Sequence, residues 1–276
     1  MNIILFQHEE LDSVIPPSDP RCVHLQKVLH KGPGDSFVAG IVNGPAGEAR
    51  ILSLSTAAGL RFQFAATSDG KPLHPVSLII GFPRPIQLKR LLRDVASLGV
   101  GQVHLCGTEL GEKSYLKATL SQPEELTAML QDGSIQARST HVPQVFVHQD
   151  VASCLEAVAA TDSIRVEGKL ALNTSIKVAG NISIRVATTH EIKVVLDNVA
   201  PACSLNSFLR GQGCGQEIQG RGVVAAIGSE RGWTERERNL FQDAGFTLCG
   251  MGERVLRTET AATTATAIIL SNMEIL

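Results

Sequence analysis

The stretch that decides the fold lies near the C-terminus and reads GMGERVLRTETAATTATAIIL, residues 250–270. Its first ten residues hold two glycines, two arginines and two glutamates, and a run of mainly alanine and threonine follows. An ordinary amphipathic helix instead alternates bulky apolar residues with charged ones. The stretch therefore predicts a charged loop, hinged by glycine, that leads directly into a helix with little side-chain bulk.

Two earlier apolar strands are predicted to end in unusual loops as well, at 194–201 (VVLDNVAP) and 226–233 (AIGSERGW). In open α/β sheets, ligands bind in the crevice at the carboxyl ends of strands. Glycines there let a ligand approach the backbone. Neither G-x-x-x-x-G-K-[ST] nor G-x-G-x-x-G occurs. The loops therefore favour a ligand held by backbone hydrogen bonds and apolar contacts, such as an adenosine without phosphates, although glycine-bounded surface loops are common.

The composition is that of a globular chain, with 43% hydrophobic and 19% charged residues among 276, enough for two domains. No apolar run approaches the roughly 20 residues of a membrane span. The N-terminal segment MNIILFQHEE lacks the features of a secretory signal, so we expect a cytoplasmic protein. The cysteines form no C-x-x-C pair and the histidines no H-x-x-x-H pair, so no metal site is predicted. The net charge of −2 argues mildly against a nucleic-acid partner but leaves room for a local basic face.

The chain divides into two segments with different sequence patterns. Residues 1–70 predict a small β-rich domain, with a hairpin turning at 43–47, a strand at 60–66 and a short helical face within 21–35. A polar linker at 68–75 follows. Residues 71–276 then predict an α/β layer with right-handed crossovers, in which apolar strands alternate with helices. Its strands are expected at 76–82, 102–107, 192–198, 222–227 and 246–252, and its helices at 86–100, 122–132, 234–246 and 258–270.

Three details qualify this pattern. Thr234 and Glu237 occupy capping-box positions at the start of one helix. Residues 163–190 alternate β-branched and polar side chains and look like an inserted β-rich segment. The glycine-rich stretch 211–222 is interpreted as a flexible loop because it precedes a strand rather than following one.

Two motifs carry a family resemblance. IGSERGWT (227–234) resembles I-G-P-E-G-G followed by an aromatic residue or leucine, and MGERVLRTETA (251–261) resembles L-G-x-R-[IV]-L-R-x-E-T-A. Together they are similar to the RsmE family, the 16S ribosomal RNA uridine-N3 methyltransferases of the SPOUT superfamily. HLQKVLHKGPGD near the N-terminus resembles that family's H-L-x-x-V-L-R-x-x-x-G-D. LGV (98–100) and QARSTHVP (136–143) resemble two further motifs more loosely.

The departures from the family pattern fall mainly outside the last motif. Ser229 and Arg231 replace proline and glycine, and His30 stands where arginine is usual. Asp94 and Ser97 occupy positions that hold lysine and glutamate in the family. The resemblance therefore supports the cofactor-side loops more firmly than the particular RNA target.

The resemblance implies a C-terminal domain with a parallel sheet and a deep trefoil knot, an N-terminal PUA-like β-barrel that binds RNA, and a homodimer. The cofactor it implies is S-adenosylmethionine, which would donate a methyl group to N3 of a uridine in small-subunit ribosomal RNA. A threaded chain would also explain the small alanines of the last helix. The implied cofactor-binding residues are Leu196, Asp197, Asn198, Ile227, Gly228, Ser229, Glu230, Gly232, Met251, Gly252, Arg254, Val255, Leu256, Thr258, Thr260 and Ala261.

No residue is an obvious general base for the uridine N3 proton. We expect Arg257 to stabilise the charge that develops on uracil, and Glu230 or Glu259 to orient that arginine or accept a proton through water. Without the motif match, the same residues would be interpreted as a solvated loop with weak surface ion pairs.

Four basic residues are candidates for phosphate contacts, although a solvated surface is the commoner role for such residues; they are Arg21, Lys27, Lys31 and Arg138. Two other functions stay open. The chain could be a paralogue that methylates a different RNA, or a non-catalytic module that binds RNA or the ribosome.

Overall fold

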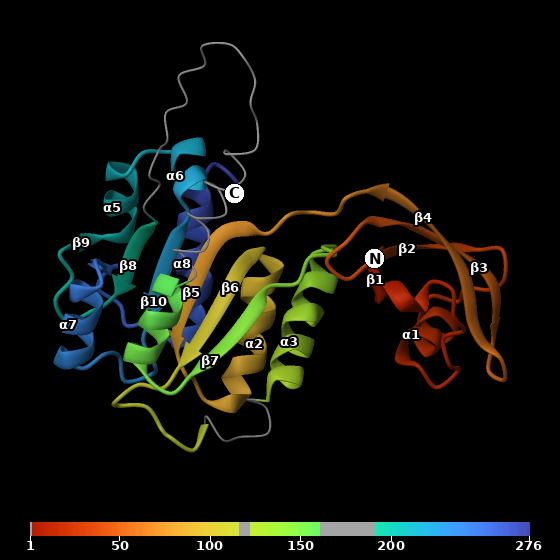
Figure 1. Cartoon of the computed structure of the whole chain (residues 1–276), viewed down its shortest axis with the longest axis horizontal. Helices are drawn as coiled ribbons and strands as arrows, with labels where there is room; N and C mark the ends of the chain where they lie inside the picture. The colour runs from red at the N-terminus through yellow and green to blue at the C-terminus, as the bar shows by residue number, and fades with distance from the viewer. Residues whose placement is uncertain (1, 116–121, 161–190) are drawn as a thin grey trace, which may run out of the picture. The chain divides into compact units, whose positions relative to one another are not determined.

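The computed structural model describes residues 2–115, 122–160 and 191–276. It divides into two compact units (Figure 1). The first comprises residues 1–73, 92–99 and 127–143, and the second comprises 74–91, 100–126 and 144–276. Among the described residues, no helix is long and apolar enough to cross a membrane. The predicted insertion at 163–190 lies outside the described residues.

The first unit is built on a four-stranded sheet in the order β1-β2-β3-β4. The strands are β1 (Ile4–Phe6), β2 (Ser36–Ile41), β3 (Ala46–Ser55) and β4 (Gly59–Ser68). β1 pairs parallel to β2, and the other neighbours are antiparallel. The predicted hairpin around 43–47 and the predicted strand at 60–66 are confirmed. Between β1 and β2 the chain forms the short helices η1 (His8–Glu10), α1 (Pro20–Val23) and η2 (His24–Val28).

One face of this sheet carries a core of aromatic and aliphatic side chains. Phe6 packs against Phe62 with ring centroids 4.3 Å apart, and Phe37 lies 6.2 Å from both. Leu25 of η2 is fully buried in the same cluster. The sheet and its helices therefore bury one shared apolar layer, as a half-solvated antiparallel sheet requires.

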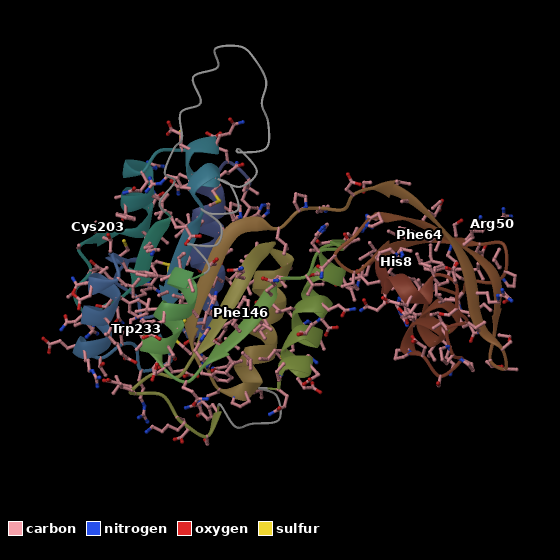
Figure 2. All side chains as sticks on the ribbon, in the orientation of Figure 1. His8, Arg50, Phe64, Phe146, Cys203 and Trp233 are labelled. Carbon is pink, nitrogen blue, oxygen red and sulfur yellow. The ribbon has the colours of Figure 1, made fainter. Side chains whose placement is uncertain are left out.

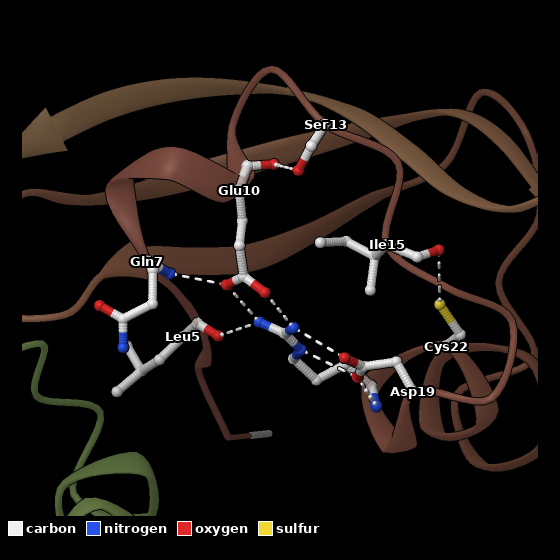
Figure 3. Close-up of polar contacts among 8 residues, drawn as sticks. Leu5, Gln7, Glu10, Ser13, Ile15, Asp19 and Cys22 are labelled. Atoms are coloured by element: carbon white, nitrogen blue, oxygen red, sulfur yellow. Dashed lines mark hydrogen bonds and ion pairs between the residues drawn. The ribbon is translucent and has the colours of Figure 1, made fainter.

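Arg21 fixes the chain around α1 through polar contacts within this unit (Figure 3 labels its partners Leu5, Glu10 and Asp19). Its guanidinium donates to Asp19 (Nη2–Oδ2 2.8 Å), to Glu10 (Nη1–Oε2 2.9 Å) and to the carbonyl oxygen of Leu5 (3.0 Å). It also lies 4.7 Å from the centroid of the Phe6 ring. With two further bonds to the same carboxylates, all five N–H donors of the side chain are used. Arg21 therefore stabilises the fold of this unit, a role that differs both from the predicted phosphate contact and from a solvated surface.

The Arg21 cluster predicts how acid affects this unit. Hydrogen bonds from Arg21 lower the pKa of Glu10 and of Asp19 below their ordinary values of 4.5 and 3.8. A depressed folded pKa gives stability that is present above the ordinary pKa and is lost as pH falls through the folded value. Replacing Arg21 by methionine removes that depression and should flatten the loss of stability in acid.

Hydrogen exchange of the β1–β4 amides, corrected for its intrinsic pH dependence, measures this effect between about pH 6 and about pH 3. Protection should fall more steeply with acid in the wild type than in Arg21→Met. Arg50→Met is the matched control, because Arg50 is exposed on β3 (Figure 2) and its loss should leave the acid profile unchanged. Identical profiles for Arg21→Met and the wild type would contradict the assignment.

Residues from later in the chain complete the first unit. Thr140 donates its hydroxyl to the carbonyl oxygen of Gly44 at 2.6 Å, and the amide of Asn43 donates to the carbonyl of Thr140 at 2.8 Å. The amide of Val142 donates to the side-chain oxygen of Asn43 at 2.9 Å. The compact unit therefore extends beyond the segment 1–70, because 138–143 supplies hydrogen-bond partners for the hairpin turn.

The second unit contains a seven-stranded sheet in the order β7-β6-β5-β10-β8-β11-β9, in which all neighbours pair in parallel (Figure 1). The strands are β5 (His74–Gly81), β6 (Val100–Cys106), β7 (Gln144–His148), β8 (Ile192–Leu196), β9 (Cys203–Ser204), β10 (Val223–Ile227) and β11 (Thr247–Gly250). β5, β8 and β10 are almost wholly buried, as expected for central parallel strands. The predicted α/β class and its five predicted strands are confirmed.

The named helices beyond α1 are α2 (Pro85–Ser97), α3 (Pro123–Gln136), α5 (Leu205–Gly211), α6 (Gln216–Arg221), α7 (Glu235–Asp243) and α8 (Thr258–Asn272). Residues 151–160 are also helical. The capping box predicted at Thr234 is present: its hydroxyl accepts from the Glu237 amide at 3.2 Å, and the Glu237 carboxylate accepts from the Thr234 amide at 2.8 Å.

The interpretation of 211–222 as a flexible loop was wrong in part, because α6 occupies 216–221. Glycines at both ends, Gly215 (φ 52°) and Gly222 (φ 78°), take backbone conformations that other residues avoid and so terminate this short helix. Ile218 is fully buried and anchors it. β7, β9 and α5 were not predicted, since each is short and lacks a clear periodic pattern.

Candidate functional site

Three loops at the carboxyl ends of neighbouring strands enclose a cavity of about 200 Å³. β8 lies between β10 and β11, so the loops that follow these strands emerge side by side. The start of α8 forms the remaining wall. The residues that line the cavity are Leu196, Asp197, Asn198, Ile227, Gly228, Ser229, Glu230, Arg231, Gly232, Cys249, Met251, Gly252, Arg254, Val255, Leu256, Thr258 and Ala261.

The loop after β10 is a tight turn built on two glycines. The amide of Gly232 donates to the carbonyl of Ser229 at 2.9 Å, and Gly232 adopts a φ of 72°. A Cβ atom on Gly228 would lie 2.9 Å from the Cα of Gly232, closer than real side chains allow. Trp233 follows, fully buried, and donates its indole N–H to the carbonyl of Leu196 at 3.2 Å. The turn is therefore compact and is tied to the end of β8.

The same turn is held from the β5 and β6 side. The hydroxyls of Thr108 and Ser229 are 3.0 Å apart, and both residues are buried. A Cβ atom on Gly81, the last residue of β5, would clash with the backbone amide of Ser229. The carboxylate of Glu230 accepts from the backbone N–H of Arg84 at 2.9 Å. Ser229, one of the departures from the family pattern, thus has a defined partner, and Glu230 is positioned at the cavity.

The loop after β8 carries a buried ion pair. The side chain of Asp197 is 1% exposed and accepts from the Nε of Arg238 at 3.0 Å. The amide of Ala200 also donates to this carboxylate, at 3.1 Å. The backbone N–H of Asp197 donates to the carbonyl of Cys249 at 3.0 Å, which links this loop to the end of β11. Asp197 therefore organises the loop as well as lining the cavity.

The loop after β11 leads into α8 without a side-chain cap. Gly252 adopts a φ of 101°, and apart from its two chain neighbours no described residue has an atom within 4 Å of the position its Cβ would take. Thr258, buried at the first position of α8, approaches the carbonyl of Gly228 with its hydroxyl at 3.3 Å. Arg257 is the N-cap residue but makes no side-chain capping bond, so the first amide groups of the helix receive no hydrogen bond from the N-cap side chain.

α8 follows this loop over β10 and β5, and it also contacts α5. Ala261, Ala262 and Ala265 are buried along it. Small side chains permit this close approach, which explains the low bulk of the sequence at 258–267.

Two cysteines meet beside this cavity. Cys249 and Cys203 are directly opposite each other on β11 and β9, and their sulfur atoms are 3.9 Å apart (Cys203 is labelled in Figure 2). Burial and the neighbouring Cys203 raise the pKa of Cys249 to about 12. The sulfur that lines the cavity is therefore a neutral thiol near neutral pH, unsuited to act as a nucleophile.

The structure brings together nearly all the residues predicted to bind the cofactor. Every one lines the cavity except Thr260, which is exposed on the first turn of α8. Arg231 and Cys249 also line it and were not predicted. The place of Cys249 at the end of an apolar strand is a signal that could identify it, whereas Arg231 departs from the family motif and has no signal from the resemblance.

The three predicted catalytic residues occupy different environments. Glu230 lines the cavity and is exposed. Arg257 is exposed and does not line it, although its neighbours Leu256 and Thr258 do. Glu259 is 8% exposed, and its Oε2 has no hydrogen-bond partner among the residues that the structure describes. A buried carboxylate oxygen without a partner is costly. Of the three residues, Glu259 is therefore the one whose hydrogen bonding is incomplete in the single chain as the structure describes it.

The predicted phosphate contacts lie in the first unit. Lys27 is exposed on η2, and Lys31 is partly exposed after it. Arg138 is exposed and adopts a φ of 55°. Arg21 is engaged within the fold as described above. Their roles toward RNA stay predictions.

Comparisons with known proteins agree on one family. The model of an RNA methyltransferase domain matches residues 69–270. Ribosomal RNA small subunit methyltransferase E of Treponema pallidum is 40% identical over 99% of this chain and 91% of its own. Ribosomal RNA small subunit methyltransferase E 1 of Borreliella burgdorferi is 25% identical, over 99% of both chains. The crystal structure of the Neisseria gonorrhoeae ribosomal RNA small subunit methyltransferase E bound to S-adenosylmethionine superposes with a TM-score of 0.67 at 19% identity, covering 98% of this chain and 97% of that one.

Proposed function

Because this chain belongs to the ribosomal RNA small subunit methyltransferase E family, we propose that it transfers a methyl group from S-adenosylmethionine to ribosomal RNA of the small subunit. The observation that carries the proposal is the cavity formed by the loops after β8, β10 and β11, which is lined by every residue predicted for the cofactor except Thr260. A paralogue acting on another RNA and a non-catalytic binding module are the alternatives that the experiment below separates.

The cavity suits S-adenosylmethionine by its chemistry. Leu196, Ile227 and Leu256 give apolar surface for a flat base. The open space around Gly252 leaves backbone N–H and C=O groups accessible for hydrogen bonds to base and ribose. The cofactor supplies an electrophilic methyl group on a sulfonium.

We place the acceptor at N3 of a uridine. That nitrogen must lose its proton to become nucleophilic, and negative charge then spreads over the uracil ring. Arg257 stabilises this charge from the end of the cofactor loop, where its exposed guanidinium faces solvent and substrate can reach it. Glu230, held by the Arg84 amide, accepts the proton through water. We assign Glu259 to orienting the arginine, because its buried Oε2 is an acceptor without a partner among the residues that the structure describes.

The order of elements supports the trefoil knot. β8 lies between β10 and β11, the chain after β8 runs to β9 beyond β11, and α8 returns from β11 to contact β10 and β5. The C-terminal segment would thereby cross the loop that follows β8. The four-stranded sheet and the short helices of the first unit are the counterpart of the PUA-like barrel, to which we assign RNA binding through Lys27, Lys31 and Arg138.

We also propose a homodimer that completes the site. Val255 lines the cavity with 78% of its surface exposed, and Val199, in the loop after β8, is 70% exposed. Ile86, two residues after the amide that binds Glu230, is 85% exposed. Exposed aliphatic side chains around one site are typical of a covered interface. Light scattering of the eluted protein measures its mass; a monomer at all concentrations would remove this proposal.

Gly252→Ala is expected to weaken S-adenosylmethionine binding at least about tenfold, equal to about 1.4 kcal/mol. Apart from the two chain neighbours, no described residue lies within 4 Å of the added methyl, so we expect the methyl to enter the space that the ligand occupies. Isothermal titration calorimetry measures the affinity.

Gly245→Ala is the matched control for this change. Gly245 also adopts positive φ (83°) with nothing near its Cβ position, but it lies outside the cavity. Both variants therefore introduce similar backbone strain, and only Gly252→Ala should lose affinity. Equal affinities in the two variants would show that Gly252 does not contact the ligand.

The experiment that tests the function incubates the purified chain with methyl-labelled S-adenosylmethionine and small ribosomal subunits, and maps the labelled nucleoside by mass spectrometry. Labelled 3-methyluridine in the small-subunit RNA supports the proposal. Label in a different RNA when total RNA is supplied identifies a paralogue. Cofactor binding without transfer to any RNA, or no cofactor binding at millimolar concentration, indicates a binding module.

A further inference from the structure

A cluster of histidine and cysteine side chains lies at the other end of the large sheet, on β6, β7 and the helical segment 151–160. The Nδ1 of His104 is 3.0 Å from the Nε2 of His148. The sulfur of Cys154 and these two nitrogens all lie within 4.8 Å of one another. His104 and Cys154 are buried, and His148 is partly buried. Three good ligand atoms for a transition metal thus converge in one place.

The strand register brings a fourth candidate to the same face. Cys106 lies two residues after His104 on β6 and is directly opposite His148 of β7. Cys106 and Cys154 are both fully buried in one cluster of packed side chains. Phe146, opposite His104, stacks on the His104 ring at 4.9 Å and shields it (Phe146 is labelled in Figure 2). Side chains two residues apart on a strand share a face, so the sheet itself gathers two histidines and one cysteine beneath the helix.

The spacing is close to that of a tetrahedral zinc site. With zinc–nitrogen bonds of about 2.0–2.1 Å and zinc–sulfur bonds of about 2.3 Å, two nitrogens lie about 3.4 Å apart and a nitrogen and a sulfur about 3.6 Å apart. The histidine pair needs to open by only about 0.4 Å, and Cys154 needs to approach by about 1 Å, to reach that geometry. A shift of this size is within the reach of side-chain rotation.

His104 and His148 approach each other through their ring nitrogens, and a neutral imidazole offers such a nitrogen to a metal ion. A hydrogen bond between the two rings accounts for their contact with each other, whereas one metal ion accounts for the convergence of all three ligand atoms.

We propose that His104, His148 and Cys154 bind one Zn²⁺ ion, with Cys106 as the fourth ligand, and that this ion ties the edge strand β7 and its neighbour β6 to the helical segment 151–160. Cysteine and neutral imidazole are the ligands of structural zinc sites, and four protein ligands leave no open position for catalysis. Binding displaces the protons of the thiols. The zinc site lies apart from the residues that line the cofactor cavity, so its role is structural.

The test uses the untagged, metal-stripped full-length chain titrated with Co²⁺, which reports cysteine ligation by a sulfur-to-cobalt charge-transfer band, and then with Zn²⁺, which displaces it. One equivalent per chain is expected. Cys154→Ser should weaken binding at least about a hundredfold and reduce the charge-transfer band. His148→Gln, at a less buried position, should weaken binding comparably and provides a second variant if Cys154→Ser does not fold.

Cys203→Ser is the matched control. Cys203 also lies beside another cysteine of the second unit, Cys249, but neither is a proposed zinc ligand. This variant should bind cobalt like the wild type. Zinc should also raise the melting temperature of the wild type and of Cys203→Ser, but not of His148→Gln. The absence of stoichiometric binding at micromolar metal, wild-type binding by Cys154→Ser, or loss of binding in Cys203→Ser would each overturn the site.

Discussion

Replacing Arg257 by alanine is expected to lower the rate of methyl transfer by about 10²–10³-fold, the loss typical when one group that stabilises developing charge is removed. The affinity for S-adenosylmethionine should change by less than about tenfold, or roughly 1.4 kcal/mol. We expect the transfer rate and the cofactor affinity to respond differently, because Arg257 does not line the cavity, although its neighbours Leu256 and Thr258 do. Single-turnover transfer to small ribosomal subunits measures the first effect, and calorimetry measures the second.

Three comparisons sharpen this prediction. Arg257→Lys keeps the charge but loses the planar guanidinium, so it should recover only part of the rate. The rate of Arg257→Ala should rise more steeply with pH than that of the wild type, because alkaline solution deprotonates uracil without help. Arg210→Ala is the control, since Arg210 is exposed on α5 outside the cavity. Near-normal transfer by Arg257→Ala would refute the role.

Replacing Arg238 by alanine is expected to lower the free energy of unfolding by about 3 kcal/mol, at the lower end of the cost of breaking a buried ion pair. The cost arises because the Asp197 carboxylate, 1% exposed, loses the Nε donor at 3.0 Å and remains buried. The Ala200 amide still donates to it at 3.1 Å, which limits the loss. Urea denaturation followed by the fluorescence of Trp233, the single tryptophan and a buried one, measures the change.

α7 supplies a matched control for this prediction. Arg236, two residues earlier, pairs with Glu109 at 3.3 Å, but the two side chains are 80% and 42% exposed. Such a surface pair contributes about 0–1 kcal/mol, so Arg236→Ala should be nearly neutral. Adding Asp197→Asn to Arg238→Ala should restore much of the stability, because it removes the orphaned charge. Equal losses of stability in Arg236→Ala and Arg238→Ala would contradict the explanation that burial of the ion pair determines the cost of breaking it.

Local chemistry made much of the second unit predictable. The strands β5, β8 and β10 are continuous apolar runs because both their faces are buried. The Thr234 capping box depends only on residues three apart. The short elements escaped prediction for the opposite reason. β9 has two residues, and α6 is defined by glycines at its ends more than by any periodicity.

The sequence by itself determined the alternation of strands and helices, the glycine-hinged loops and the motif that identifies the family, because these depend on neighbours along the chain. The tertiary structure alone decided which of them meet. It placed β8 between β10 and β11, so that three separate loops enclose one cavity, and it engaged Arg21 within its own unit. It also set His104 beside His148, 44 residues later in the chain. Histidines so far apart show no ligand spacing, since pairing between strands, not distance in sequence, brings them together.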